Sequence, residues 1–157
     1  MSAAMKNPHL EIERKFLIRN LPRGLQRYPH CEIAQGYLAV DRRAHVRLRK
    51  RGRVCTLTFK RGPARAREER EIHLNLAQFA ILWPATKGAR LTKTRYYVPW
   101  RKLTIEIDIY HGSNEGLMVA EVEFDDVQTY HSFRPPDWIG DEVTGANRYS
   151  NVKLARD

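Results

Sequence analysis

The chain has 157 residues, of which 28 are Lys or Arg and 18 are Asp or Glu, so its formal net charge is +10. It is 42% hydrophobic, and at this length a folded chain buries roughly 70% of its unfolded surface, which excludes a chain that is disordered throughout. We expect one globular domain over residues 1–157.

The sequence also argues against secretion and membrane insertion. The N-terminal segment has no apolar stretch before charged residues appear, so a signal peptide is not supported. No run approaches the ~18 apolar residues of a membrane span. Cys31 and Cys55 lack metal-binding spacing and are typical of free thiols in a reducing compartment. We therefore expect a cytoplasmic protein with no membrane partner.

Segments in which apolar and polar residues alternate recur along the chain and predict eight β-strands. Their expected spans are residues 10–18, 32–40, 44–51, 53–61, 67–74, 89–97, 102–110 and 118–124. Tight links at residues 40–43 and 50–53 favour antiparallel neighbours.

Three short helices accompany these strands. Leu76, Phe79, Ala80 and Trp83 recur at helical spacing and predict a helix that ends before Pro84. A second helix is expected over residues 126–132, and residues 141–156 are expected to form a loop that runs into a C-terminal helix.

Charged residues occupy the polar positions of the strands two residues apart, which places them on one face of each strand. These groups are Glu11, Glu13 and Lys15, then Arg47 and Arg49, Glu69 and Glu71, Lys93 and Arg95, Glu106 and Asp108, and Glu121 and Glu123. A closed barrel would hold this face in a wet lumen, cover the apolar face with helices and leave no open sheet edge. We predict a mainly β (α+β) fold, an eight-stranded antiparallel closed barrel with a few flanking helices and a C-terminal helix.

Such a lumen, with Lys60 added, would be dense in both signs of charge. Carboxylates are the ligands that hard divalent cations prefer, and Arg and Lys are the groups that bind phosphate chains. The combination predicts a site for a metal-chelated phosphate chain, in which cations neutralise charge on the phosphoryl oxygens.

The ordered motifs resemble those of the CYTH superfamily, the triphosphate tunnel metalloenzymes. Residues 11–15 match its ExExK signature, and the resemblance continues through residues 35–38, 47–49, the strand of Lys60, and residues 69–72, 93–96, 106–108, 121–124 and 148–151. It covers nearly the whole chain and points to the compact bacterial branch that acts on inorganic triphosphate. It implies a single tunnel domain that hydrolyses tripolyphosphate to pyrophosphate and phosphate through a metal-activated water, with Mg²⁺ or Mn²⁺ as cofactor.

The resemblance also implies roles for individual residues. The metal ions would be held by Glu11, Glu13, Glu121 and Glu123, with Glu71 and Asp108 helping to fix metal or water. The phosphates would be held by Lys15, Arg47, Arg49, Lys60, Lys93, Arg95 and, from the C-terminal helix, Lys153. Tyr37 would pair with Lys15 as a catalytic dyad that handles a proton or orients water. Glu69 and Glu106 are expected to form ion pairs around the site.

Other functions remain open at this point. A class IV-type adenylate cyclase shares the ExExK motif and the tunnel and would make cyclic AMP from ATP, although the sequence shows no obvious adenine-binding cluster. Thiamine triphosphate and nucleoside triphosphates are alternative substrates for a hydrolase. A noncatalytic polyphosphate- or RNA-binding module would use the basic residues but leaves the carboxylates of the same face unexplained. We therefore expect a small anionic triphosphate as the partner, no nucleic acid, and a monomer or homodimer.

Overall fold

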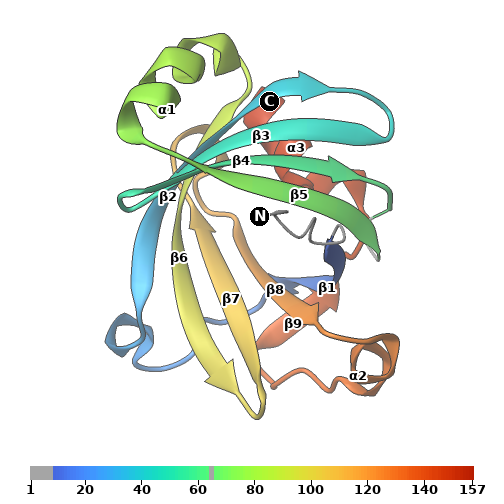
Figure 1. Ribbon diagram of the computed structural model, residues 1–157. Helices are drawn as coiled ribbons and strands as arrows, with labels where there is room; N and C mark the ends of the chain where they lie inside the picture. The colour runs from blue at the N-terminus through green and yellow to red at the C-terminus, as the bar shows by residue number, and fades with distance from the viewer. Residues whose placement is uncertain (1–8, 64–65) are drawn as a thin grey trace, which may run out of the picture.

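The computed structural model of the protein describes residues 9–63 and 66–157 (Figure 1). The strands of this part of the chain are β1 (His9–Ile18), β2 (His30–Val40), β3 (Ala44–Arg51), β4 (Val54–Arg61), β5 (Arg67–Leu74), β6 (Arg90–Trp100), β7 (Leu103–Tyr110), β8 (Met118–Phe124) and β9 (Ile139–Glu142). The eight strands that the alternating pattern predicted are confirmed as β1 to β8.

Strand β1 closes the barrel. The sheet order is β5-β4-β3-β2-β6-β7-β8-β1-β9, all neighbouring pairs are antiparallel, and β5 also pairs with β1. One edge of β1 pairs with β8 from Ile12 to Leu17, and its other edge pairs first with β5, from His9 to Glu11, and then with β9. The predicted eight-stranded antiparallel barrel is therefore confirmed.

Strand β9 is an addition to the prediction, which placed a loop from residue 141 onward. Ile139 is buried in the core, and Glu142 forms an ion pair of 2.9 Å with Arg14 of β1. These two contacts hold a four-residue segment against the edge of β1, although the segment lacks the alternation that marks the other strands.

The predicted tight links are also present. Gly52 joins β3 to β4 with φ of 58°, a left-handed conformation that glycine adopts without steric cost. Asp41 closes the link between β2 and β3, because its carboxylate accepts hydrogen bonds from the backbone N–H groups of Arg43 and Ala44 at 2.8 and 2.7 Å.

Two of the helices lie outside the barrel, and the C-terminal helix enters one end of its lumen (Figure 1). The helices are α1 (Leu76–Leu82), α2 (Val127–Ser132) and α3 (Asn151–Arg156), with short 3-10 turns η1 (Leu25–Arg27), η2 (Trp83–Thr86), η3 (Gly112–Asn114) and η4 (Asn147–Tyr149). The chain continues past the predicted end of α1 as η2, whose first turn accepts Pro84. Among the described residues, no helix is long and apolar enough to cross a membrane.

Apolar residues pack on both sides of the barrel wall. On the outside, residues of β1, β6, β7 and β8 such as Phe16, Ile105 and Val122 form the main core with Phe133. Inside, Leu154 and Ala155 of α3 pack against Tyr37, Leu91, Tyr110 and Val119 of the strands. Helix α3 therefore fills part of the lumen and leaves the remaining interior to the charged side chains.

Candidate active site

The inward faces of the strands line a cavity of about 240 Å³. Its carboxylates are Glu11, Glu13, Glu69, Glu71, Glu106, Glu121 and Glu123, and its cations are Lys15, Arg47, Arg49, Arg51, Lys60, Arg67 and Arg95. Tyr37, His45 and residues 150–152 complete the lining. The two signs of charge that the strand pattern placed on one face thus share one cavity.

Arg47 and Arg49 of β3 line this cavity and form hydrogen bonds only with neutral groups among the described residues. The Arg47 side chain reaches only the Thr58 hydroxyl, at 3.5 Å, and its Nε is buried without a hydrogen-bond partner. Arg49 donates from Nε and Nη2 to the Gln35 side-chain oxygen at 3.1 and 3.0 Å. Burial and the charges of Arg47 and Arg95 lower the pKa of Arg49 to about 9. Neither guanidinium has an ion pair with a carboxylate in the described part of the chain, so both could accept an anionic ligand.

Lys60 of β4 holds the carboxylates at the closing seam of the barrel. Its ammonium contacts Glu11 at 2.8 Å and Glu69 at 3.8 Å. Burial opposes ionisation of Glu11, but Lys60 and a hydrogen bond with Glu69 outweigh burial and lower the pKa of Glu11 to about 2. Burial and the Glu11 contact raise the pKa of Glu69 to about 7. The negative charge of this pair therefore lies on Glu11, while Glu69 holds its proton up to about neutral pH.

Glu13 lies next to this group, and the neighbouring carboxylates act on its pKa. Its Oε1 lies 3.4 Å from Nη2 of Arg67. Burial and the neighbouring charges of Glu121 and Glu11 raise the pKa of Glu13 to about 7. A cation placed among these three carboxylates would relieve their repulsion.

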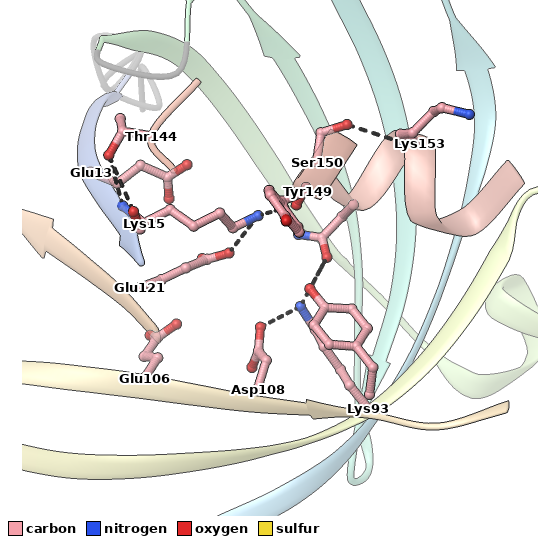
Figure 2. A network of polar contacts seen from close by, with 12 residues as sticks. Glu13, Lys15, Lys93, Glu106, Asp108, Glu121, Thr144, Tyr149, Ser150 and Lys153 are labelled. Carbon is pink, nitrogen blue, oxygen red and sulfur yellow. Dashed lines mark hydrogen bonds and ion pairs between the residues drawn. The ribbon is translucent and has the colours of Figure 1, made fainter. Parts of the chain in front are cut away.

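Lys15 connects the carboxylates to the segment before α3, as Figure 2 shows. Its ammonium lies 3.3 Å from Glu121 and donates a 2.7 Å hydrogen bond to the backbone oxygen of Tyr149. Burial opposes ionisation of Glu121, but Lys15 and Arg95 outweigh it and hold the pKa of Glu121 well below its usual range.

Lys93 and Asp108 lie outside the cavity lining, although they belong to the same strand face as Arg95. Asp108 accepts a hydrogen bond from Lys93 at 2.6 Å (Figure 2). It also accepts from Arg95 at 2.7 and 2.8 Å, and both Lys93 and Asp108 are fully buried. Burial lowers the pKa of Lys93 to about 7, against the attraction of Asp108. Lys93 also donates to Asn151, the first residue of α3, at 3.3 Å. Asp108 therefore fixes the orientation of Arg95, and Lys93 helps to hold the start of α3 in place.

Tyr37 lines the cavity without contacting Lys15. Its hydroxyl accepts a 3.3 Å hydrogen bond from Gln35, whereas the described contacts of the Lys15 ammonium are with Glu121 and Tyr149. Burial raises the pKa of the Tyr37 phenol, although Arg47 and Arg49 oppose this. The predicted Lys15–Tyr37 pair is therefore not formed in this structure, and Tyr37 stays protonated.

The remaining predicted residues lie nearer the openings. Glu71 accepts a 2.8 Å hydrogen bond from Thr58, and both Glu71 and Glu123 are exposed. Glu106 pairs with Arg95, and burial raises the pKa of its carboxyl. Lys153 lies on the exposed side of α3, pairs with Asp157 and is absent from the described lining of this cavity.

Arg67, Arg51 and His45 line the cavity but were not among the predicted site residues. The signal was present, because each lies two residues from a predicted member of the same strand face, namely Glu69, Arg49 and Arg47. The Nε of Arg67 is buried without a hydrogen-bond partner, as is that of Arg47.

The donor set suits a hard divalent cation, because Glu11, Glu13 and Glu121 offer only carboxylate oxygens. Among the described residues, no three or more His, Cys, Asp or Glu side chains are already arranged as a metal cluster. The reason lies in their partners, since Lys60, Arg67 and Lys15 each draw one of these carboxylates toward themselves.

Comparison with known proteins gives relatives that span nearly the whole chain, although no family model matches it. An inorganic triphosphatase of Nitrosomonas europaea is 42% identical over 149 residues, which cover 92% of this chain and 96% of that protein. An inorganic triphosphatase of Acetivibrio thermocellus is 34% identical over 155 residues, 94% of each chain.

A solved structure of an inorganic triphosphatase shares the fold with a TM-score of 0.69 and 39% identity, over 94% of this chain and 95% of that one. The similarity thus extends over nearly the whole length of both chains. The chain belongs to the inorganic triphosphatase branch of the CYTH superfamily, a group of hydrolases that act on phosphoanhydrides.

Proposed function

We propose that this protein hydrolyses inorganic triphosphate to pyrophosphate and phosphate inside the charged cavity, with a divalent cation as cofactor. The observation that carries the proposal is the pair Arg47 and Arg49, a buried and a partly buried guanidinium group, neither with a carboxylate partner among the described residues. Buried charges are normally paired, so two unpaired cations in a cavity full of carboxylates indicate an anionic ligand. The names of the relatives agree with this substrate.

Arg47 and Arg49 are placed to hold one stretch of the phosphate chain from β3. Arg95 is fixed by Asp108 and Glu106, so it presents its remaining donors from β6 in a defined orientation. Lys93 supports that orientation from below, through Asp108. As phosphoryl oxygens gain charge during hydrolysis, these preorganised cations stabilise it without having to move.

Glu11, Glu13, Glu121 and Glu123 would hold Mg²⁺ or Mn²⁺, with Glu71 at the exposed edge. Bound there, such an ion lowers the pKa of water and neutralises phosphoryl charge. Lys15, Lys60 and Arg67 each pair with one of these carboxylates, and with the carboxylates bound to a cation they would be available to phosphate oxygens.

Tyr37 acts in this scheme as a hydrogen-bond donor. Its raised pKa keeps the phenol protonated, so it does not serve as a base. Together with Lys15 it can orient a phosphate oxygen or a water molecule, because both side chains line the same cavity.

The shape of the cavity favours inorganic triphosphate over nucleotides and thiamine triphosphate. The cavity volume is about 240 Å³, below the ~300 Å³ at which pockets for drug-sized ligands begin. Within the described lining, Tyr37 and His45 are the aromatic rings, and they contact each other edge to face. A cyclase would require a surface on which adenine stacks, and these two rings do not offer one.

The two cysteines support a reducing location such as the cytoplasm. Cys31 and Cys55 are both free thiols, and Cys55 is buried beside Leu48 and Phe79. The fold is complete in the described region without a disulfide, as expected where thiols stay reduced.

The experiment is a substrate panel. Purified protein is incubated with tripolyphosphate, ATP or thiamine triphosphate in Mg²⁺, in Mn²⁺ and in excess EDTA, and phosphate, pyrophosphate and cyclic AMP are measured. We expect equal amounts of phosphate and pyrophosphate from tripolyphosphate, slower turnover of the other two substrates and no turnover in EDTA. Formation of cyclic AMP from ATP as the main reaction would overturn the proposal.

A further inference from the structure

A second and larger cavity, of about 730 Å³, opens at one end of the barrel. Its wall is formed by the β2–β3 link, by Gly62 and Pro63 after β4, by residues 143–147 and by α3. In Figure 1 the β2–β3 and β4–β5 connections lie together at the right of the barrel, beside α3. We name this cavity the vestibule.

The vestibule is continuous with the charged cavity. Glu13, Lys15, His45, Lys60 and Arg67 line both. A linear ligand that is too long for the inner cavity of about 240 Å³ can therefore extend into the vestibule without leaving the protein.

The charge of the vestibule differs from that of the inner cavity, because its outer wall is basic. Arg42, Arg43 and Arg156 line this wall and are exposed, and none of them has an ion pair with a carboxylate in the described part of the chain. Asp41 is the acidic residue beside them, but its carboxylate is bound to backbone N–H groups of the link. The outer wall thus offers several guanidinium groups to an anion.

The chemistry of the wall favours a phosphate chain over a nucleobase as the occupant. His45 is its one aromatic ring among the described lining residues, and the remaining apolar contacts come from small side chains such as Val40, Val143 and Val152. Bases are normally held by stacking on aromatic or guanidinium planes with polar groups that read their edges. A chain of phosphates needs only cations spaced along its path.

We propose that the vestibule binds the distal phosphates of linear inorganic polyphosphates longer than triphosphate, while the terminal phosphates occupy the inner cavity. The inference rests on the proposed function, because it takes the inner cavity as the site of the terminal triphosphate. It also gives a role to the excess of basic residues around the β2–β3 link, which a triphosphate inside the barrel leaves unused.

The test compares chain lengths at equilibrium. Binding of tripolyphosphate and of a linear polyphosphate of defined, longer chain length is measured by calorimetry in EDTA, at physiological salt. The intact protein should bind the longer chain about tenfold more tightly, since each additional charge-assisted contact adds of the order of this factor. The variant Arg42→Ala/Arg43→Ala should lose this gain and keep its affinity for tripolyphosphate.

The matched control is Arg23→Ala/Arg27→Ala. It removes the same charge from exposed residues in and beside η1, which lies at the lower left of Figure 1, away from the vestibule. If both double variants weaken binding of the longer polyphosphate equally, the effect comes from the overall positive charge of the protein, and the vestibule site is overturned. Circular dichroism of both variants, expected to match that of the intact protein, verifies that the link still folds.

Three further outcomes separate this inference from the proposed function. Equal affinity for both chain lengths, with tripolyphosphate still hydrolysed in Mg²⁺, overturns the vestibule alone. Tighter binding of ATP than of tripolyphosphate, lost in Arg42→Ala/Arg43→Ala, would assign the vestibule to a nucleoside and overturn the proposal. Failure to hydrolyse tripolyphosphate in any divalent cation would instead contradict the proposed function.

Discussion

Arg47 and Arg49 extend from one strand into the same cavity, and burial together with the positive charge of Arg47 lowers the pKa of Arg49 to about 9. Neither cation pairs with a carboxylate in the described part of the chain, and four carboxylates of the cavity are paired with Lys15, Lys60, Arg67 and Arg95 instead. The arrangement costs stability unless an anion binds between the two guanidinium groups. It is therefore the part of the structure that most directly indicates a phosphate ligand.

Replacing Arg47 should weaken substrate binding. Loss of a charge-assisted hydrogen bond costs about 1.5 to 3 kcal/mol, so Arg47→Ala should lower kcat/KM for tripolyphosphate by about 10- to 100-fold. Steady-state kinetics in Mg²⁺ would measure this loss. Arg70→Ala is the control, because Arg70 is exposed and pairs with Glu68 on strand β5. Equal kinetics for the two variants would contradict the phosphate site.

Without metal, the stability of the protein should fall as the pH rises from about 4.5 to about 7. Glu13 and Glu69 have pKa values raised from 4.5 to about 7, and these two carboxyls outweigh the opposing group His45, whose pKa is lowered by burial from 6.5 to about 4. The folded chain therefore binds more protons than the unfolded chain in this window. Stability is therefore lost as the carboxyls ionise. Urea denaturation in EDTA across this range measures the effect.

Glu13→Gln should remove part of this dependence. At pH 8 in EDTA the variant should be more stable than the intact protein by about 2 kcal/mol, since each pKa unit corresponds to about 1.4 kcal/mol and neighbouring groups share the repulsion. It should also lose the rise in melting temperature that Mg²⁺ gives the intact protein. Glu115→Gln, at an exposed turn, is the control. A variant that keeps the metal response would refute a role for Glu13 in cation binding.

Asp108→Asn should destabilise the fold more than it weakens metal binding. Asp108 is fully buried and neutralises Lys93 and Arg95, so the change removes the carboxylate partner of buried Lys93 and leaves Arg95 to Glu106 and Glu121. Breaking such a pair costs about 3 kcal/mol or more, which denaturant unfolding in EDTA would show.

A different result would assign Asp108 to the metal site. Unchanged unfolding together with a large loss of Mn²⁺ affinity, measured by calorimetry, would mean that Asp108 contacts the metal, as the family resemblance implied. Asp125→Asn, at an exposed position after β8, serves as the control for charge alone.

Tyr37→Phe should reduce activity only modestly. The phenol stays protonated and can contribute one neutral hydrogen bond, so kcat/KM should fall by about tenfold or less. A general base would account for about 10²- to 10⁴-fold. A loss in that range would show that Tyr37 takes up a proton and that the Lys15–Tyr37 dyad forms during turnover.

The strands could be predicted because each one buries one face and exposes the other, which leaves a period of two in the sequence. Closure of the barrel could not be located in this way. Strand β1 pairs with β5 over only three register pairs, from His9 to Glu11, and with β9 at its other end. Strand β9 is held by Ile139 and by the Arg14–Glu142 ion pair, which are contacts between residues far apart in the chain.

The charged face was predictable for the same reason, but depth within the barrel was not. Lys93 and Arg95 share one face of β6, yet Lys93 is fully buried against Asp108 while Arg95 reaches the cavity. Alternation does not distinguish these positions, because the filling of the lumen by α3 decides which side chains remain open to a ligand. Arg67 was missed although the alternation indicates it. It lies two residues before Glu69 on the same strand face, but the prediction included only Glu69 and Glu71 from this strand.

A crystal structure with tripolyphosphate and Mn²⁺ tests the phosphate site most directly. The phosphate chain should lie within hydrogen-bonding distance of Arg47 and Arg49, and the anomalous signal of Mn²⁺ should lie beside Glu11, Glu13 and Glu121. A tripolyphosphate bound outside the barrel, with Arg47 and Arg49 unchanged and no Mn²⁺ at these carboxylates, would contradict the site.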